Sequence, residues 1–205
     1  MSGIVAQNAG RTSGLVKASA GGGAWTLIKS ITAASDSDID FVDGSSDVVL
    51  DSTYPIYVFK FINIHPSAKG NFQFNMSVDT GSNYNVTKNT TVHLAWHGES
   101  DAGAASGYND SLDLAQGTGA ANISGDIVTD NDASLSGSMY LFSPSSTTFA
   151  KHFIAETQRM DDATSNNLYM AGYGNTTSAV DAVQFSMASG NIDAGKIKLF
   201  GLKDS

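Results

Sequence analysis

The sequence predicts an all-β protein: an antiparallel β-sandwich, jelly-roll-like in architecture, that follows an extended N-terminal arm. Three observations predict this fold. From Trp25 onward, short runs of alternating apolar and polar residues recur, clusters of Asp, Gly, Ser and Asn separate them, and no stretch between them has the length and period of an amphipathic helix. Without crossover helices a parallel α/β sheet is excluded, so about ten short strands should pair as antiparallel hairpins and pack as two sheets.

The segment before Trp25 differs in composition from the rest of the chain. Residues 1–24 contain no acidic residue and two basic ones, and they end near three consecutive glycines. Their apolar residues form two short pairs without a helical period. Two interpretations are open: a disordered terminus, or an arm that becomes ordered on another subunit while its bases face carboxylates. We treat 1–24 as an anchoring arm and 25–205 as the sandwich domain. The candidate anchoring residues are Ile4, Val5, Arg11, Leu15, Val16 and Lys17.

The expected strands follow in chain order, each rich in β-branched or aromatic residues. They are 25–31, 38–42, 56–64, 72–78, 92–97, 121–128, 137–142, 149–156, 167–173, 182–187 and 196–202. The run at 56–64, IYVFKFINI, is apolar on both faces, which predicts a central strand. In FQFNMSV, at 72–78, the residues Phe72, Phe74, Met76 and Val78 share one face, which should belong to the core. The turn material includes residues 43–47, 67–70, 79–83, 100–107, 130–134 and 189–195.

Composition and charge exclude several function classes. The formal net charge is -9 and there is no basic run, so a nucleic-acid partner is not expected. The chain has no Cys, which excludes disulfides and thiolate chemistry. The start lacks the pattern of a secretory signal, and no apolar stretch is long enough to span a bilayer. We therefore expect a protein made in the cytoplasm without a membrane span.

The sequence Asp79-Thr80-Gly81-Ser82 matches the motif that surrounds a catalytic carboxylate in pepsin-like and retroviral aspartic proteases. That chemistry requires two carboxylates that share one proton. The nearest second motif is IDAG at 192–195, but Ala194 stands where those families have a hydroxyl residue. We therefore predict that 79–83 is a hairpin turn after the preceding strand and that the protein is not an enzyme.

Metal and cofactor sites are not expected either. His93 and His97 lie on one face of an expected strand, where four residues of spacing separate the rings by about 13 Å, too far for one tetrahedral site. Two groups of aspartates could supply oxygen ligands for calcium, but they match no calcium motif, and charge that protects strand edges explains them better. These groups are Asp36, Asp38, Asp40 and Asp126, Asp130, Asp132.

A set of aromatic residues among hydroxyls and amides suits either a sugar-binding face or a hydrated protein interface. The set is Trp25, Tyr57, Trp96, Tyr108, Tyr140, Tyr169 and Tyr173.

The N-terminal stretch MSGIVAQNAGRTSGLVKAS resembles the leader of structural proteins of marine tailed bacteriophages. Segments along the body are similar to the same virion-protein family. They are Trp25 to Ser30, Tyr54 to Pro66, Asp113 to Thr118, Leu141 to Phe153 and Ser189 to Leu202. The resemblance covers most of the chain and implies a component of the virus particle.

We therefore expect a non-enzymatic virion structural protein, anchored by its arm, exposed on the particle surface and associated with the tail or a fibre. Its partners would be other virion proteins and further copies of itself, with a trimer favoured, and a glycan of the host surface is a further candidate. A capsid decoration protein and a carbohydrate-binding module are the alternatives. No cofactor is expected.

Overall fold

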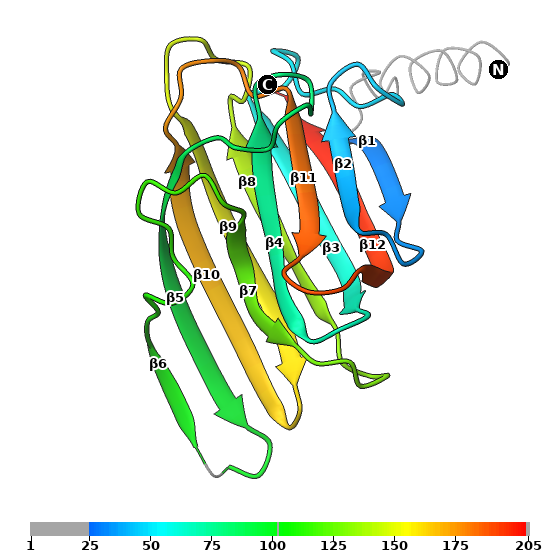
Figure 1. The fold of residues 1–205 in the computed structure, drawn as a ribbon, viewed down its shortest axis with the longest axis vertical. Helices are drawn as coiled ribbons and strands as arrows, with labels where there is room; N and C mark the ends of the chain where they lie inside the picture. The colour runs from blue at the N-terminus through cyan, green and yellow to red at the C-terminus, as the bar shows by residue number, and fades with distance from the viewer. Residues whose placement is uncertain (1–24, 102, 204–205) are drawn as a thin grey trace, which may run out of the picture.

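The computed structural model describes residues 25–101 and 103–203, which form twelve β-strands in two facing antiparallel sheets (Figure 1). In this part of the chain no residue is helical, and no helix could therefore cross a membrane. The predicted all-β class is confirmed. The strands are β1 Trp25–Thr32, β2 Asp38–Val42, β3 Ile56–Pro66, β4 Gly70–Ser77, β5 Lys88–Gly98, β6 Ala104–Tyr108, β7 Ala121–Ile127, β8 Leu135–Phe142, β9 Lys151–Asp161, β10 Thr164–Gly174, β11 Ala182–Met187 and β12 Ile192–Leu202.

The pairing pattern is that of a long hairpin rolled into a jelly roll. Strands from the two ends of the chain pair in turn: β1 with β12, β2 with β11, β3 with β8 and β4 with β7. The pairs β3–β12 and β4–β11 then join these ladders into two sheets. The resulting orders, β1-β12-β3-β8 and β2-β11-β4-β7, are those of an eight-stranded jelly roll. The predicted jelly-roll-like sandwich is thereby confirmed.

Two additional hairpins widen the first of these sheets. The strands β9, β10, β5 and β6 continue beyond β8, so that this sheet has eight strands and the other has four. The segment 109–120, which connects β6 to β7, runs along the edge of β5 beyond β6, where the Lys88 amide donates to the Gly117 carbonyl at 2.8 Å, and Leu112 and Leu114 pack against the core. Leu114 in this segment accepts a hydrogen bond from the Thr90 amide at 2.9 Å and donates its own amide to the Thr90 hydroxyl at 2.8 Å. The opposite face of the large sheet, called the outer face below, points away from the small sheet.

Aromatic contacts around Phe185 of β11 join the two sheets. Its ring centroid lies 6.1 Å from that of Phe41, 5.0 Å from Phe59, 5.2 Å from Phe61 and 5.8 Å from Phe72. All five side chains are buried. Because Phe59 and Phe61 come from β3 of the large sheet and the others from the small sheet, these rings fill the space between the sheets.

In the central strand β3, a bulge changes which side chains face the core. The strand is an internal strand of the large sheet, as predicted, with β12 and β8 as its neighbours, and it places Phe59 and Phe61 in the core. Asn63 then has a φ of 50°, and the pairing with β8 shifts between Phe61 and Ile64. This bulge turns Ile64 into the core and leaves Ile62 exposed, although simple alternation places both on one face.

The structure corrects the predicted turns on either side of β5. Residues 79–83 do not form a hairpin turn, because β4 belongs to the small sheet and β5 to the large one, so the segment crosses between sheets. Thr80 and Gly81 do have positive φ, and the Ser82 amide donates to the Asp79 carbonyl, so a tight turn is present without a hairpin. Residues 100–107 are only partly turn, because β6 occupies Ala104–Tyr108.

The predicted core face of β4 is correct except at its end. Phe72, Phe74 and Met76 are fully buried, whereas Val78 is exposed. The strand ends at Ser77, so Val78 belongs to the crossover and no longer follows the alternation.

Lys88 of β5 is buried between the sheets, where no carboxylate of residues 25–101 and 103–203 forms a salt bridge with it. Its ammonium group donates hydrogen bonds to the side-chain oxygen of Asn75 and to the carbonyl of Val86. Burial lowers the pKa of Lys88 to about 8. Lys151 of β9 is also buried, and burial lowers its pKa as well.

The free energy of unfolding should therefore rise between about pH 8 and about pH 10. In this window the unfolded chain binds more protons than the folded protein, whose Lys88 has a lowered pKa, so stability increases with pH. The expected rise is on the order of 2 kcal/mol, since one pKa unit corresponds to about 1.4 kcal/mol. Above about pH 10 the stability should fall again, because burial raises the pKa of Tyr57 and Tyr84 and the unfolded chain then loses protons that the fold retains.

Urea unfolding across this pH range measures the effect. The Lys88→Met variant should lose most of the rise, and Lys69→Met, a change at an exposed lysine, should keep it. Equal stability of the unmodified protein at the two ends of the window would contradict the assignment.

Candidate functional site

Apolar and aromatic side chains gather on the outer face of the large sheet, where strand pairing aligns them in two neighbouring rows. The first row runs from β1 to β5 through Leu27, Phe200, Val58, Tyr140, Ile154, Ala171 and Thr91. The second row has Trp25, Leu202, Ile56 and Phe142 on β1 to β8, and His152, Tyr173 and Asn89 on β9 to β5. Contiguous apolar surface of this kind marks binding sites more often than isolated exposed residues do.

An aromatic cluster lies at the β1 end of this face. It consists of Trp25, Val58, Lys60, Tyr140 and Phe200. The ring of Trp25 lies edge-on to Phe200 at 5.7 Å and to Tyr140 at 6.5 Å between centroids. Val58 lies between these two residues in the sheet and is 0% exposed, although it is on the outer face. The ammonium group of Lys60 lies 5.3 Å from the Trp25 centroid, a cation–π contact. Trp25 itself remains 41% exposed.

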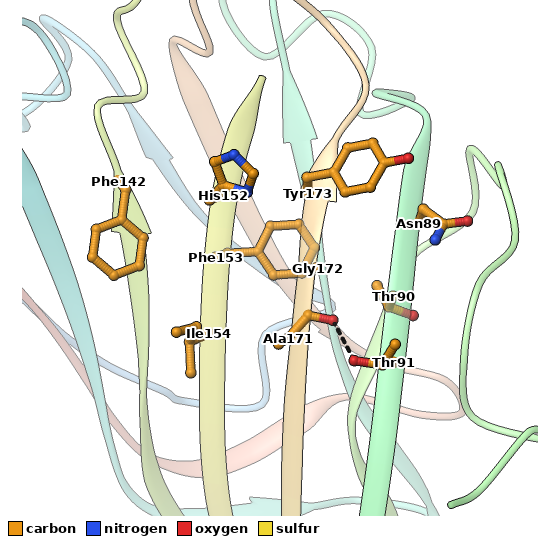
Figure 2. A pocket seen from close by; sticks show the side chains of 10 residues that line it. All are labelled: Asn89, Thr90, Thr91, Phe142, His152, Phe153, Ile154, Ala171, Gly172 and Tyr173. Atoms are coloured by element: carbon orange, nitrogen blue, oxygen red, sulfur yellow. Dashed lines mark hydrogen bonds between the residues drawn. The ribbon is translucent and has the colours of Figure 1, made fainter. Parts of the chain in front are cut away.

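Beside the aromatic cluster, toward β5, ten residues line a shallow groove of about 470 Å³, called the outer groove here. Figure 2 shows Ala171 at its floor, Phe142, His152 and Ile154 on one side, and Tyr173, Asn89 and Thr91 on the other. The lining is Asn89, Thr90, Thr91, Phe142, His152, Phe153, Ile154, Ala171, Gly172 and Tyr173. This volume lies within the range of about 300–1,000 Å³ that is usual for small-molecule sites.

The floor of the groove is low because β10 has two small residues there. Ala171 contributes only a methyl group to the outer face. Gly172 faces the core, where an added Cβ would lie 2.6 Å from the Asn89 carbonyl oxygen and 2.8 Å from the ring of Phe153. Glycine therefore lets Phe153 pack directly beneath the β10 backbone.

The groove offers ring surfaces and neutral hydrogen-bonding groups. The rings of His152 and Tyr173 are tilted by 57° with centroids 6.3 Å apart. The Thr91 hydroxyl donates to the Ala171 carbonyl at 3.3 Å, and the Tyr173 hydroxyl accepts from Gln116 at 3.4 Å. No carboxylate, thiol or amine is among the lining residues, so the polar side-chain groups of the groove are the Asn89 amide, the hydroxyls of its threonines and of Tyr173, and the His152 imidazole. The arrangement is suited to binding by stacking and hydrogen bonds.

In the protease-like motif, the carboxylate of Asp79 is hydrogen-bonded to residues of its own loop. The Asp79 carboxylate accepts hydrogen bonds from the side-chain amide of Asn83 at 2.7 Å, the hydroxyl of Ser77 at 2.7 Å and the backbone amide of Asn83 at 2.8 Å. These bonds, the Asn83 side chain foremost, lower the pKa of Asp79.

The second protease-like motif, at 192–195, does not lie beside the first, at 79–82. The Asp181 carboxylate, just before β11, accepts from the Thr80 amide at 3.0 Å, so the first motif lies at the start of β11. The second motif opens β12, after the end of β11. The carboxylates of Asp79 and Asp193 thus lie at opposite ends of this strand, where they cannot share a proton.

The histidines and aspartates considered as ligands are also placed apart. His93 and His97 are exposed on β5, and a ring nitrogen of His97 lies 3.1 Å from the carboxylate of Asp101. Across residues 25–101 and 103–203, no group of three or more His, Cys, Asp or Glu side chains could hold a metal ion. The aspartates lie on or before the edge strand β2, namely Asp36, Asp38 and Asp40, or on β7 and in the loop after it, namely Asp126, Asp130 and Asp132.

The predicted anchoring residues, Ile4, Val5, Arg11, Leu15, Val16 and Lys17, lie outside the described residues. The described chain starts at Trp25, which is both the first residue of the edge strand β1 and a member of the aromatic cluster. The segment 1–24 is therefore joined to the fold at this cluster.

The aromatic residues that were expected to form one face divide into three places. Trp25, Tyr140, Tyr169 and Tyr173 share the outer face, Tyr57 is buried, and Trp96 and Tyr108 lie on the β5–β6 hairpin. Sequence reasoning missed Phe142, His152 and Ala171. Alternation within 149–156 and 167–173 groups His152 with Ile154 and Ala171 with Tyr173, but it does not reveal that these strands are neighbours.

Compared with protein-family models, with curated proteins and with solved structures, the chain matches none.

Proposed function

We propose that the protein is a non-enzymatic structural component of a tailed-bacteriophage particle, attached through residues 1–24 and exposed on the particle surface as part of the tail or a fibre. The observation that carries this proposal is the junction of the segment 1–24 with an exposed aromatic cluster on an edge strand. An edge strand offers unpaired backbone groups, and an exposed aromatic ring offers apolar contact area. A neighbouring subunit can use both.

The family resemblance and the architecture support the same role. Four of the five segments that resemble virion proteins include parts of β1, β3, β8, β9 and β12, which all belong to the large sheet, and the fifth, Asp113 to Thr118, lies in the connection between β6 and β7. A Cys-free jelly roll folds without oxidation, and its open edges at β1, β2, β6 and β7 can pair with further copies of the chain. We favour a homotrimer of this chain in the virion, because closed symmetric contacts between copies bury such strand edges.

Mass spectrometry of gradient-purified particles tests the proposal. The protein should be present at a constant ratio to the major capsid protein after washes with high salt. A ratio far below one would place it in the tail or a fibre, and a ratio near one would make it a capsid decoration protein instead. Its absence from washed particles would refute the proposed function.

The contribution of the aromatic cluster can be tested with the two tryptophans of the chain. Trp25→Ser should reduce incorporation into particles several-fold, because it removes the exposed ring of the cluster next to the arm. Trp96→Ser is the matched control, since Trp96 is similarly exposed but lies on β5 at the far end of the sheet. Equal incorporation of both variants would exclude the cluster from the attachment surface.

A further inference from the structure

We infer that the outer groove is a binding site for an uncharged saccharide, with one sugar ring seated over Ala171. None of its ten lining residues is Asp, Glu, Lys or Arg, although the chain carries a formal net charge of -9. The lining therefore offers no charged group that could pair with a cationic or an anionic ligand. The charge distribution thus selects a neutral ligand.

The aromatic rings determine where such a ligand lies. The centroids of His152 and Tyr173 are 6.3 Å apart, and a ring placed between them would need about 3.5–4 Å on each side. The ligand therefore cannot be sandwiched. It lies instead over the Ala171 methyl group, with Ile154 and Thr91 beside it in the same row and the two tilted rings at one end (Figure 2). A pyranose presents one face of C–H groups, which matches this apolar floor.

The polar groups at the rim match the hydroxyls that surround a sugar ring. Figure 2 draws one hydrogen bond among the lining residues, from Thr91 to the carbonyl of Ala171. Figure 2 draws no hydrogen bond from the Asn89 side-chain amide or from the His152 ring to another of the ten lining residues. An amide both donates and accepts, as does a neutral imidazole, and so do sugar hydroxyls.

An entirely apolar partner fits the groove less well. It would remove water from the Asn89 amide and the His152 ring without replacing the lost hydrogen bonds, which opposes binding. A saccharide restores these bonds while its C–H face covers the floor. This combination of a small apolar floor, tilted rings and a neutral polar rim favours the saccharide over a hydrophobic peptide.

The test measures binding of oligosaccharides to the purified full-length chain by glycan array, followed by titration calorimetry. The panel holds neutral hexose, deoxyhexose and N-acetylhexosamine oligomers and one acidic oligomer, oligogalacturonate. At least one neutral series should bind in a saturable manner. Ala171→Leu, which fills the floor, and His152→Ala, which removes one ring, should each weaken binding about tenfold or more. Both positions are on the outer face, so the thermal transition should stay unchanged.

Tyr169→Ala is the matched control. It removes an exposed ring from the same face of the same strand, two residues from Ala171 but outside the groove, and should leave the affinity unchanged. The inference is overturned if no neutral oligosaccharide binds, if binding survives Ala171→Leu, or if oligogalacturonate is preferred. Because the assay uses the isolated protein, saccharide binding can be absent while incorporation into particles is normal. Equally, saccharide binding can be present while the protein is absent from particles.

Discussion

Replacing Phe185 by alanine should destabilise the sandwich by about 3–5 kcal/mol, as the truncation of fully buried phenylalanines does. The ring of Phe185 touches four other phenylalanine rings, two of which come from the opposite sheet. The surrounding rings cannot close the resulting cavity without leaving their places between two hydrogen-bonded sheets. A lower midpoint of urea unfolding with an unchanged slope would report this loss.

Phe149→Ala serves as the control for this experiment. Its side chain is 70% exposed, so truncation should change the free energy of unfolding by no more than about 0.5 kcal/mol. A loss below about 1 kcal/mol for Phe185→Ala would mean that the two sheets do not pack through these rings.

Deleting residues 2–20 should prevent incorporation into particles while the melting temperature of the sandwich stays nearly the same. Four aliphatic side chains contribute about 1.5–3 kcal/mol each when buried, whereas ordering a backbone costs about 1–2 kcal/mol per residue. From this comparison we expect that the segment 1–24 does not fold by itself and that the sandwich folds without it. On a partner, added main-chain hydrogen bonds and charge pairs can change the balance.

Measuring both particle incorporation and thermal unfolding of the same truncated protein separates a role of the segment 1–24 in attachment from a role in the stability of the sandwich. A finer pair of variants tests the proposed anchors: Leu15→Ser with Val16→Ser should reduce incorporation, and Ala18→Ser with Ala20→Ser in the same segment should not. Normal incorporation of the truncated chain would move the attachment surface to the edges of the sandwich.

The sequence was sufficient to predict most of the strands because their side chains alternate with the period of the pleat. The signal was strongest where one face is buried, as in β4, whose Phe72, Phe74 and Met76 are all core. It failed at β6, because the Ala, Ser and Gly residues of Ala104–Tyr108 have no apolar face and the strand is exposed along its length. Local composition there is the same as in a turn.

The candidate site was less accessible to sequence reasoning, for a geometric reason. Phe142, His152, Ala171 and Asn89 meet only because β8, β9, β10 and β5 are neighbours in one sheet. Periodicity assigns a side chain to a face of its own strand, but the order of strands depends on which long-range pairs form. The bulge at Asn63 had no sequence signal for the same reason, since it depends on the pairing partner.

The pairing of the first described strand with the last one affects how the protein is made. In the sheet β1 has β12 as its neighbour, so Trp25 at one end of the fold is matched to Leu202 at the other. A nascent chain cannot dock β1 until β12 has left the ribosome, and such long-range pairing makes folding slow compared with local hairpins. Chains that are cut short during translation therefore lack the partner that fixes β1 in the sheet. Only a chain whose β12 has already been synthesised can hold β1 in the sheet, so the topology ties the formation of this edge to a late stage of translation.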